Sequence, residues 1–124
     1  MIKGIGIDIV EIERVKEAVD KYGRAFLDKI FTARELKYCR RSRAFKYPEL
    51  AARFAAKEAY SKAIGTGIAG FGRRKKGLSW KNIEIINNAS GQPFLAIDRK
   101  IDRRVQVSLS HSRDYAVASV YIEK

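Results

Sequence analysis

Two acidic residues and one lysine have the types and spacing of a small ion-binding site. Glu58 and Lys62 are four residues apart in a predicted helix, so their side chains share one helix face. Gly65-Thr66-Gly67 follows, where positive backbone angles are tolerated and amides can stay free for an anion. Asp8 stands alone in an apolar, β-branched run. These groups predict a metal and phosphate site; an exposed Glu-Lys pair before an ordinary glycine cap is the structural alternative.

A long helix must carry Glu58 and Lys62. It is predicted to start at Pro48, a residue type favoured in the first helical turn, and to run to Ile64. Alanines favour helix and leave room for other backbone to approach, which would place Glu58 in a packed interior. The alanines in this stretch are Ala51, Ala52, Ala55, Ala56, Ala59 and Ala63.

Strands and a shorter helix complete the expected fold. Residues 3–10 predict the strand that carries Asp8, and residues 11–22 have apolar positions at helical spacing. We expect an α+β fold, in which one antiparallel sheet is packed by the long helix and the shorter amphipathic helix. The four later strands of that sheet are predicted at 78–86, 94–97, 105–112 and 115–122.

Three intervening segments are less regular. Thr32-Ala33-Arg34-Glu35 has the pattern of a capping box and predicts a second short helix, which extends to about residue 41. The apolar stretch 26–31 is compatible with either helix or strand. The charged segment 98–104 is compatible with a short helix.

Length and composition bound the class of protein. The chain has 124 residues, of which 46% are hydrophobic and 32% charged, and this suits a single globular domain over 1–124. No apolar run has the length of a membrane helix and no signal-peptide pattern is present, so we expect a cytoplasmic protein. Cys39 lies among basic residues with no histidine near it in sequence, and we predict that it is not catalytic.

The net charge of +12 requires an anionic partner. A small nucleic-acid-binding protein is one interpretation. An acidic protein or a polyphosphate cofactor is the other. Arg14, Lys21 and Arg24 lie on or just after the first helix and form either a docking surface or a solvated face. The basic run 72–77 is either a solvated charge run or a lid that faces phosphate.

Four separated motifs occur together in one order. They are Gly-Ile-Asp-Ile-Val-Glu-Ile at 6–12, Phe-Thr-Ala-Arg-Glu at 31–35, the block from Arg53 to Gly67, and Ser-Leu-Ser-His at 108–111. In this combination the chain resembles the holo-acyl-carrier-protein synthases of the 4'-phosphopantetheinyl transferase superfamily. The resemblance covers nearly the whole chain. It implies transfer of 4'-phosphopantetheine from coenzyme A to a serine of apo acyl carrier protein, with release of adenosine 3',5'-bisphosphate, in fatty acid biosynthesis.

The resemblance also assigns roles to individual residues. Asp8 and Glu58 match the metal-binding acids, with Mg²⁺ as the cofactor, a cation that one or two carboxylates plus substrate phosphates commonly hold. Lys62 would add positive charge at the coenzyme A pyrophosphate, and the proton acceptor is either Glu58 or a metal-bound water. Residues 65–67 match contacts to the nucleotide phosphate, and Ser110 and His111 match the adenosine end of coenzyme A.

The resemblance extends to partners and assembly. Arg14, Lys21 and Arg24 would receive an acidic helix of the carrier protein, and the same positive field would steer coenzyme A. Arg14 is expected to stand apart from Glu58 and Lys62. Nucleic acid then becomes the alternative partner. Members of this short type form homotrimers with each active site between two subunits, and we expect the same here.

Overall fold

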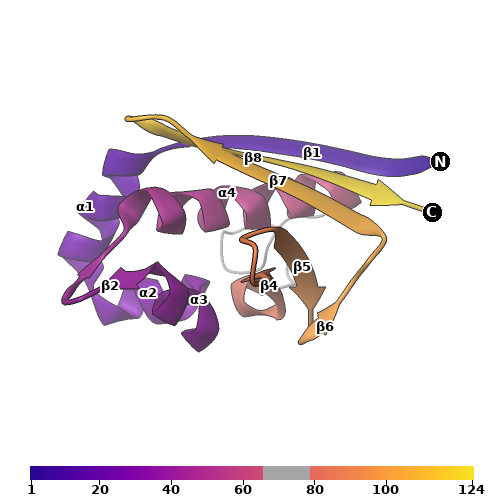
Figure 1. Cartoon of the computed structure of the whole chain (residues 1–124). Coiled ribbons are helices and arrows are strands. Elements are labelled where there is room, and N and C mark those ends of the chain that lie inside the picture. Colours follow the sequence, from indigo (N-terminus) through magenta and orange to yellow (C-terminus); the bar gives the residue numbers. More distant parts are fainter. Residues whose placement is uncertain (66–78) are drawn as a thin grey trace.

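The computed structural model describes residues 1–65 and 79–124. Figure 1 shows the arrangement of the elements, with both termini at the same end of the molecule. The helices are α1 (Ile12–Tyr22), α2 (Arg24–Ile30), α3 (Ala33–Cys39), α4 (Tyr47–Ile64) and the 3-10 helix η1 (Trp80–Asn82). The strands are β1 (Ile2–Glu11), β2 (Arg40–Arg41), β3 (Ala44–Phe45), β4 (Ile83–Asn87), β5 (Pro93–Ile97), β6 (Lys100–Ile101), β7 (Val105–His111) and β8 (Tyr115–Glu123).

Helix α4 and an antiparallel sheet of order β1-β8-β7 form the centre of the molecule. The sheet lies along one side of α4, and α1, α2 and α3 lie around the other sides (Figure 1). Close approach of β1 to α4 depends on two glycines. A Cβ atom at Gly4 would collide with the carbonyl of Ala63, and one at Gly6 with the carbonyl of Ala59. The predicted close approach of other backbone to the alanine-rich helix is therefore confirmed.

The expected fold class is confirmed, but the strands form separate sheets. Strands β4, β5 and β6 make a second three-stranded antiparallel sheet, so the single five-stranded sheet expected from the sequence is wrong. The predicted strand at 78–86 begins only at Ile83, because Trp80–Asn82 form a 3-10 turn capped by Ser79. Segment 98–104 is not a helix: Asp98 and Arg99 have positive φ angles and turn the chain from β5 into β6.

Local sequence signals explain the ends of the helices. Helix α4 has proline in its first turn, as predicted, and ends at Gly65, whose φ of 82° is in the left-handed region. The capping box of Thr32 and Glu35 at the start of α3 is confirmed, since both of its hydrogen bonds are present. The apolar stretch 26–31 belongs largely to a helix, α2.

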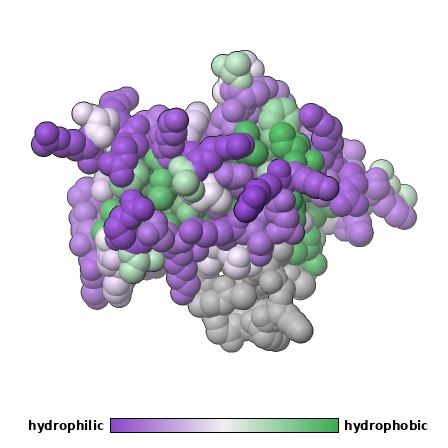
Figure 2. Space-filling view, turned by 90° about the horizontal axis from the view of Figure 1, so that it is seen from below, coloured by the Kyte–Doolittle hydropathy of each residue, from purple (hydrophilic) through white to green (hydrophobic). Residues whose placement is uncertain are grey.

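The two sides of the molecule differ in polarity. On the face opposite the β1-β8-β7 sheet, hydrophilic side chains predominate (Figure 2). On β1, alternate residues turn away from α4, and three of these are large and apolar: Ile5, Ile7 and Ile9 are 60%, 61% and 61% exposed. An exposed apolar row on a sheet commonly marks an interaction surface. Among the residues that the structure describes, no helix is long and apolar enough to cross a membrane.

Candidate active site

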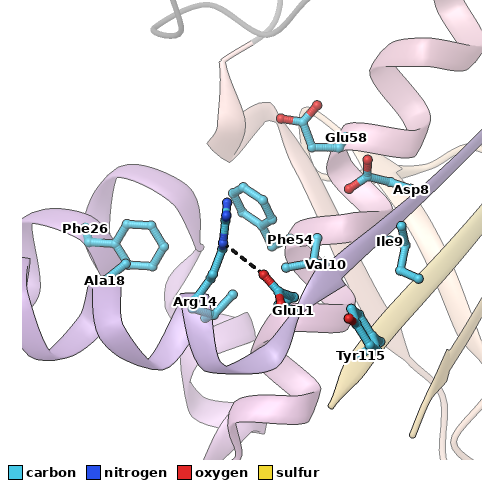
Figure 3. A pocket seen from close by; sticks show the side chains of 11 residues that line it. Asp8, Ile9, Val10, Glu11, Arg14, Ala18, Phe26, Phe54, Glu58 and Tyr115 are labelled. Carbon is cyan, nitrogen blue, oxygen red and sulfur yellow. Dashed lines mark ion pairs between the residues drawn. The ribbon is translucent and has the colours of Figure 1, made fainter.

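The predicted acids meet at a pocket between α1, β1 and α4. The pocket has a volume of about 600 Å³, and Figure 3 shows how its side chains are arranged. Its lining combines carboxylates and one guanidinium group with apolar side chains. The lining residues are Asp8, Ile9, Val10, Glu11, Arg14, Val15, Ala18, Phe26, Phe54, Glu58 and Tyr115.

Asp8 and Glu58 come from different elements. Asp8 projects from β1, where it pairs in register with Ala118 of β8, and Glu58 projects from the middle of α4. Both side chains line the pocket (Figure 3), and both residues are partly buried. The close packing of β1 on α4 explains why residues fifty positions apart in sequence meet here.

Lys62 is joined to this site through Asp8. Its Nζ donates to Asp8 Oδ1 and to the carbonyl oxygen of Ile7, each at 3.0 Å. The Asp8 side chain is 17% exposed, whereas that of Lys62 is 54% exposed. Lys62 thus presents a positive charge at the solvent side of a more buried carboxylate.

The two carboxylates suit one kind of cation. No group of three or more His, Cys, Asp or Glu side chains that could hold a metal occurs within residues 1–65 and 79–124. That excludes a complete protein ligand set among these residues. Mg²⁺ needs no such set, because it is usually bound through one or two carboxylates, substrate phosphates and waters. The donors of Asp8 and Glu58 fit this pattern.

The glycine-rich turn does not offer its first amide. The N–H of Gly65 donates to the carbonyl of Lys62 at 3.2 Å and closes the C-terminal turn of α4. The expectation of an open amide is therefore wrong at Gly65, because the helix cap uses that donor. The predicted contacts of Thr66 and Gly67 lie outside the described residues, as does the basic run at 72–77.

His111 lines a second pocket, at the end of β7. This pocket has a volume of about 370 Å³. Arg53 Nη1 donates to Glu49 Oε1 at 3.3 Å, its Nη2 donates to Asn87 Oδ1, and His111 Nε2 lies 3.8 Å from Glu49 Oε2. The pocket is lined by Tyr38, Glu49, Arg53, Asn87, Gly91, Pro93, Val107, Ser108, Leu109 and His111.

Ser110 and His111 are therefore not in the pocket of Asp8 and Glu58. Both residues are exposed at the end of β7, and neither lines that first pocket. Within one chain, the predicted adenosine contacts and the predicted metal ligands occupy different places.

The predicted docking residues are exposed around α1. Arg14 pairs with Glu11 at 3.0 Å, Arg24 pairs with Asp28 at 3.1 Å, and Lys21 is exposed. Arg14 is not apart from the acidic site as expected, because it lines the same pocket as Glu58. The reason is that α1 follows β1 directly and turns back over the pocket.

Buried charges are the feature that the sequence interpretation missed. Glu35, Arg53 and Lys57 are at most 1% exposed, and Lys57 Nζ lies 2.7 Å from Glu35 Oε1. One signal was available, since Lys57 stands among alanines that must face the core. Cys39 is also fully buried, and burial raises its pKa to about 12, which opposes thiolate formation.

Comparisons with known proteins agree with the motifs and the fold. The model of the 4'-phosphopantetheinyl transferase superfamily matches residues 4–120. The holo-[acyl-carrier-protein] synthase of Geobacillus sp. (strain WCH70) is 48% identical over 125 residues, covering 100% of this chain and 98% of the relative.

Solved structures give the same result. The holo-(acyl-carrier-protein) synthase of Bacillus anthracis in complex with CoA (3',5'-ADP) matches with a TM-score of 0.78 and 41% identity, over 100% of this chain and 98% of that one. The enzyme of Neisseria meningitidis matches with a TM-score of 0.81 and 37% identity, over the whole of both chains. The chain therefore belongs to the holo-acyl-carrier-protein synthases, within the 4'-phosphopantetheinyl transferase superfamily.

Proposed function

We propose that this protein transfers 4'-phosphopantetheine from coenzyme A to a serine of apo acyl carrier protein. The serine hydroxyl gives its proton to the Glu58 carboxylate or to water, and its oxygen forms a bond to the β-phosphorus of coenzyme A. The bond from that phosphorus to the bridging oxygen breaks, and adenosine 3',5'-bisphosphate leaves. One observation carries the proposal: two carboxylates line one pocket, and a lysine is bonded to one of them. The acceptor serine belongs to the carrier protein, so this chain needs no nucleophile of its own.

In this proposal Asp8 and Glu58 hold Mg²⁺. When bound there, the cation would polarise the attacked phosphorus and offset charge on the departing oxygen. Lys62 holds the Asp8 carboxylate in place and supplies positive charge for the pyrophosphate. Its 54% exposure supports this role, because the ammonium group is accessible to an anion from solvent.

We further propose that the nucleotide end of coenzyme A is bound by Ser110 and His111 of a neighbouring subunit, in a homotrimer. Two observations support this. The His111 pocket is separate from the pocket of Glu58 within one chain. A coenzyme A molecule that contacts residues of both kinds of pocket would therefore bind more readily between two neighbouring chains. The exposed row of Ile5, Ile7 and Ile9 offers an apolar surface that subunit contact would bury. The proposed contacts of Thr66 and Gly67 belong to the phosphate end.

The carrier protein is proposed to dock on Arg14, Lys21 and Arg24. Their exposure and the net charge of +12 suit an acidic partner. Residues 1–124 are proposed to form one transferase domain. The resemblance to the family supports a cytoplasmic location and a place in fatty acid biosynthesis.

The decisive experiment weighs the carrier protein. Purified protein is incubated with coenzyme A, magnesium and an apo acyl carrier protein, and the intact mass of the carrier is measured. The expected result is a mass increase of one phosphopantetheine, lost when magnesium is replaced by a chelator. If several carriers gain no mass while the protein is retained on DNA or RNA in a salt-sensitive way, the nucleic-acid interpretation replaces this one.

A further inference from the structure

Lys57 and Glu35 form a saturated ion pair in the core. Lys57 Nζ donates to Glu35 Oε1 at 2.7 Å, to the carbonyl of Ile30 at 2.7 Å and to that of Trp80 at 3.1 Å, which uses all three of its donors. Glu35 Oε2 accepts from the N–H of Ile85 at 2.7 Å. Both charged side chains are 0% exposed. Such a pair contributes little net stability, but removal of one partner leaves a buried charge.

The pair joins the elements that surround α4. Lys57 belongs to α4, Ile30 ends α2, Glu35 lies in the first turn of α3, Trp80 begins η1 and Ile85 lies in β4. A single ammonium group and a single carboxylate therefore connect five elements. The sheet of β1, β8 and β7 lies on another side of α4 and takes no part in these hydrogen bonds.

Helix α4 needs a specific contact of this kind. Five of its ten buried residues are alanines, and similar small side chains distinguish poorly between nearby rotations of a helix. Three directed hydrogen bonds from Lys57 distinguish them sharply. Buried polar pairs can fix the register of packed helices even where they add no stability.

The pair is linked to the pocket through neighbouring residues in two ways. Glu58 follows Lys57 in sequence, so the rotation of α4 that directs Lys57 into the core also directs Glu58 to the pocket. Trp80 stacks on Phe54, with ring centroids 5.0 Å apart and an interplanar angle of 17°. Phe54 lines the same pocket as Glu58.

We propose that Lys57 and Glu35 are positioning residues, which hold the pocket wall formed by Glu58 and Phe54. The inference rests on the proposed function, because its effect is read from the transferase reaction. Neither residue touches the reacting atoms. Their removal lowers turnover through the placement of Glu58 and of the ring of Phe54.

The test compares removal of the ion pair with a plain cavity in the same helix. In the double variant Lys57→Met, Glu35→Gln, both charges are removed together, so no unpaired buried charge remains. The control is Leu50→Ala, a cavity in the same helix two turns before Glu58, at a residue that is 0% exposed. Turnover, Michaelis constants and melting temperature are measured well below both melting transitions. The chain has one tryptophan, so the fluorescence emission reports on Trp80 alone.

We expect the double variant to lose about 10- to 100-fold in kcat, since a displacement of about 1 Å can cost that much. Its KM for coenzyme A should change by less than about threefold, and its emission should shift. Leu50→Ala should keep kcat within about threefold and keep the emission of the unchanged protein.

Three outcomes have different meanings. A double variant that keeps the kcat of Leu50→Ala overturns the positioning role, whatever its emission. A loss of kcat without an emission shift removes Trp80 and Phe54 from the proposal. If the unchanged protein itself transfers no phosphopantetheine, the proposed function fails and the pair is only structural.

Discussion

Replacement of Gly6 by alanine should separate the two halves of the acidic site. The added Cβ atom would lie 2.8 Å from the carbonyl carbon of Ala59 and closer still to its oxygen. Carbon atoms pack at about 3.5 to 4.0 Å, so β1 must move from α4 by at least about 0.7 Å. Backbone lies on both sides of this contact, and no flexible side chain can absorb the shift.

The displacement acts directly on the site. Gly6 is two residues from Asp8 on β1, and Ala59 is next to Glu58 on α4. We expect Gly6→Ala to lower the stability by about 1 to 3 kcal/mol through overpacking. We expect kcat to fall by up to about 100-fold, because the two carboxylates no longer keep their separation.

A matched control separates displacement from simple loss of stability. Val120 on β8 is the register partner of Gly6 and is 0% exposed. Val120→Ala leaves a cavity at a cost of about 2 kcal/mol without pushing β1 from α4. Its kcat should stay within about threefold of the unchanged protein, as measured by carrier mass and by thermal melting. A Gly6→Ala protein with normal stability, or with normal kcat at reduced stability, would refute the reasoning.

Four further predictions follow from the structure. Asp8→Asn and Glu58→Gln should each nearly abolish turnover while the melting temperature changes little. Activity is measured while magnesium is titrated, and normal activity in either variant would contradict the proposed metal site. Lys62→Ala should weaken coenzyme A binding and turnover more than stability, because the partly exposed pair with Asp8 contributes only about 0 to 1 kcal/mol to the free energy of unfolding. If only the melting temperature falls, Lys62 has a structural role. Arg14→Glu should raise the KM for the carrier protein more than the KM for coenzyme A. Arg14→Ala should have a carrier KM between those of the unchanged protein and Arg14→Glu, and high salt should reduce the differences. Steady-state kinetics with each substrate varied would show the larger change in the KM for coenzyme A if Arg14 serves the nucleotide. Cys39 should resist alkylation at pH 8 in the folded protein and react after unfolding, and rapid alkylation of the folded protein would contradict this. Because burial raises the pKa of Cys39 from 9.0 to about 12, its contribution to stability is fully present below pH 9.0 and is lost as the pH rises through about 12.

Much of the local structure could be predicted from the sequence. The capping box at Thr32, the proline in the first turn of α4 and the glycine at its end each depend on a few neighbouring residues, and the structure has all three. The family was also predictable, because four motifs in a fixed order are specific even where each one is not.

The sheets could not be predicted in the same way. Pairing depends on contacts between distant segments, and alternation within a strand does not say which strand will lie beside it. The chain turns at Asp98 and Arg99, through positive φ angles that their residue types only weakly favour, and this keeps β4, β5 and β6 together as a separate sheet.

By itself, the sequence determined the chemistry that this protein can offer: two carboxylates, a lysine and a large positive charge. Only the tertiary structure decided which of these groups meet. Asp8 reaches Glu58 because Gly6 lets β1 lie against α4, and Arg14 joins them because α1 turns back over the pocket. The alanines around Lys57 hint that its side chain is buried, but its pairing with Glu35 could not be predicted from the sequence, since the two residues meet only in the folded chain.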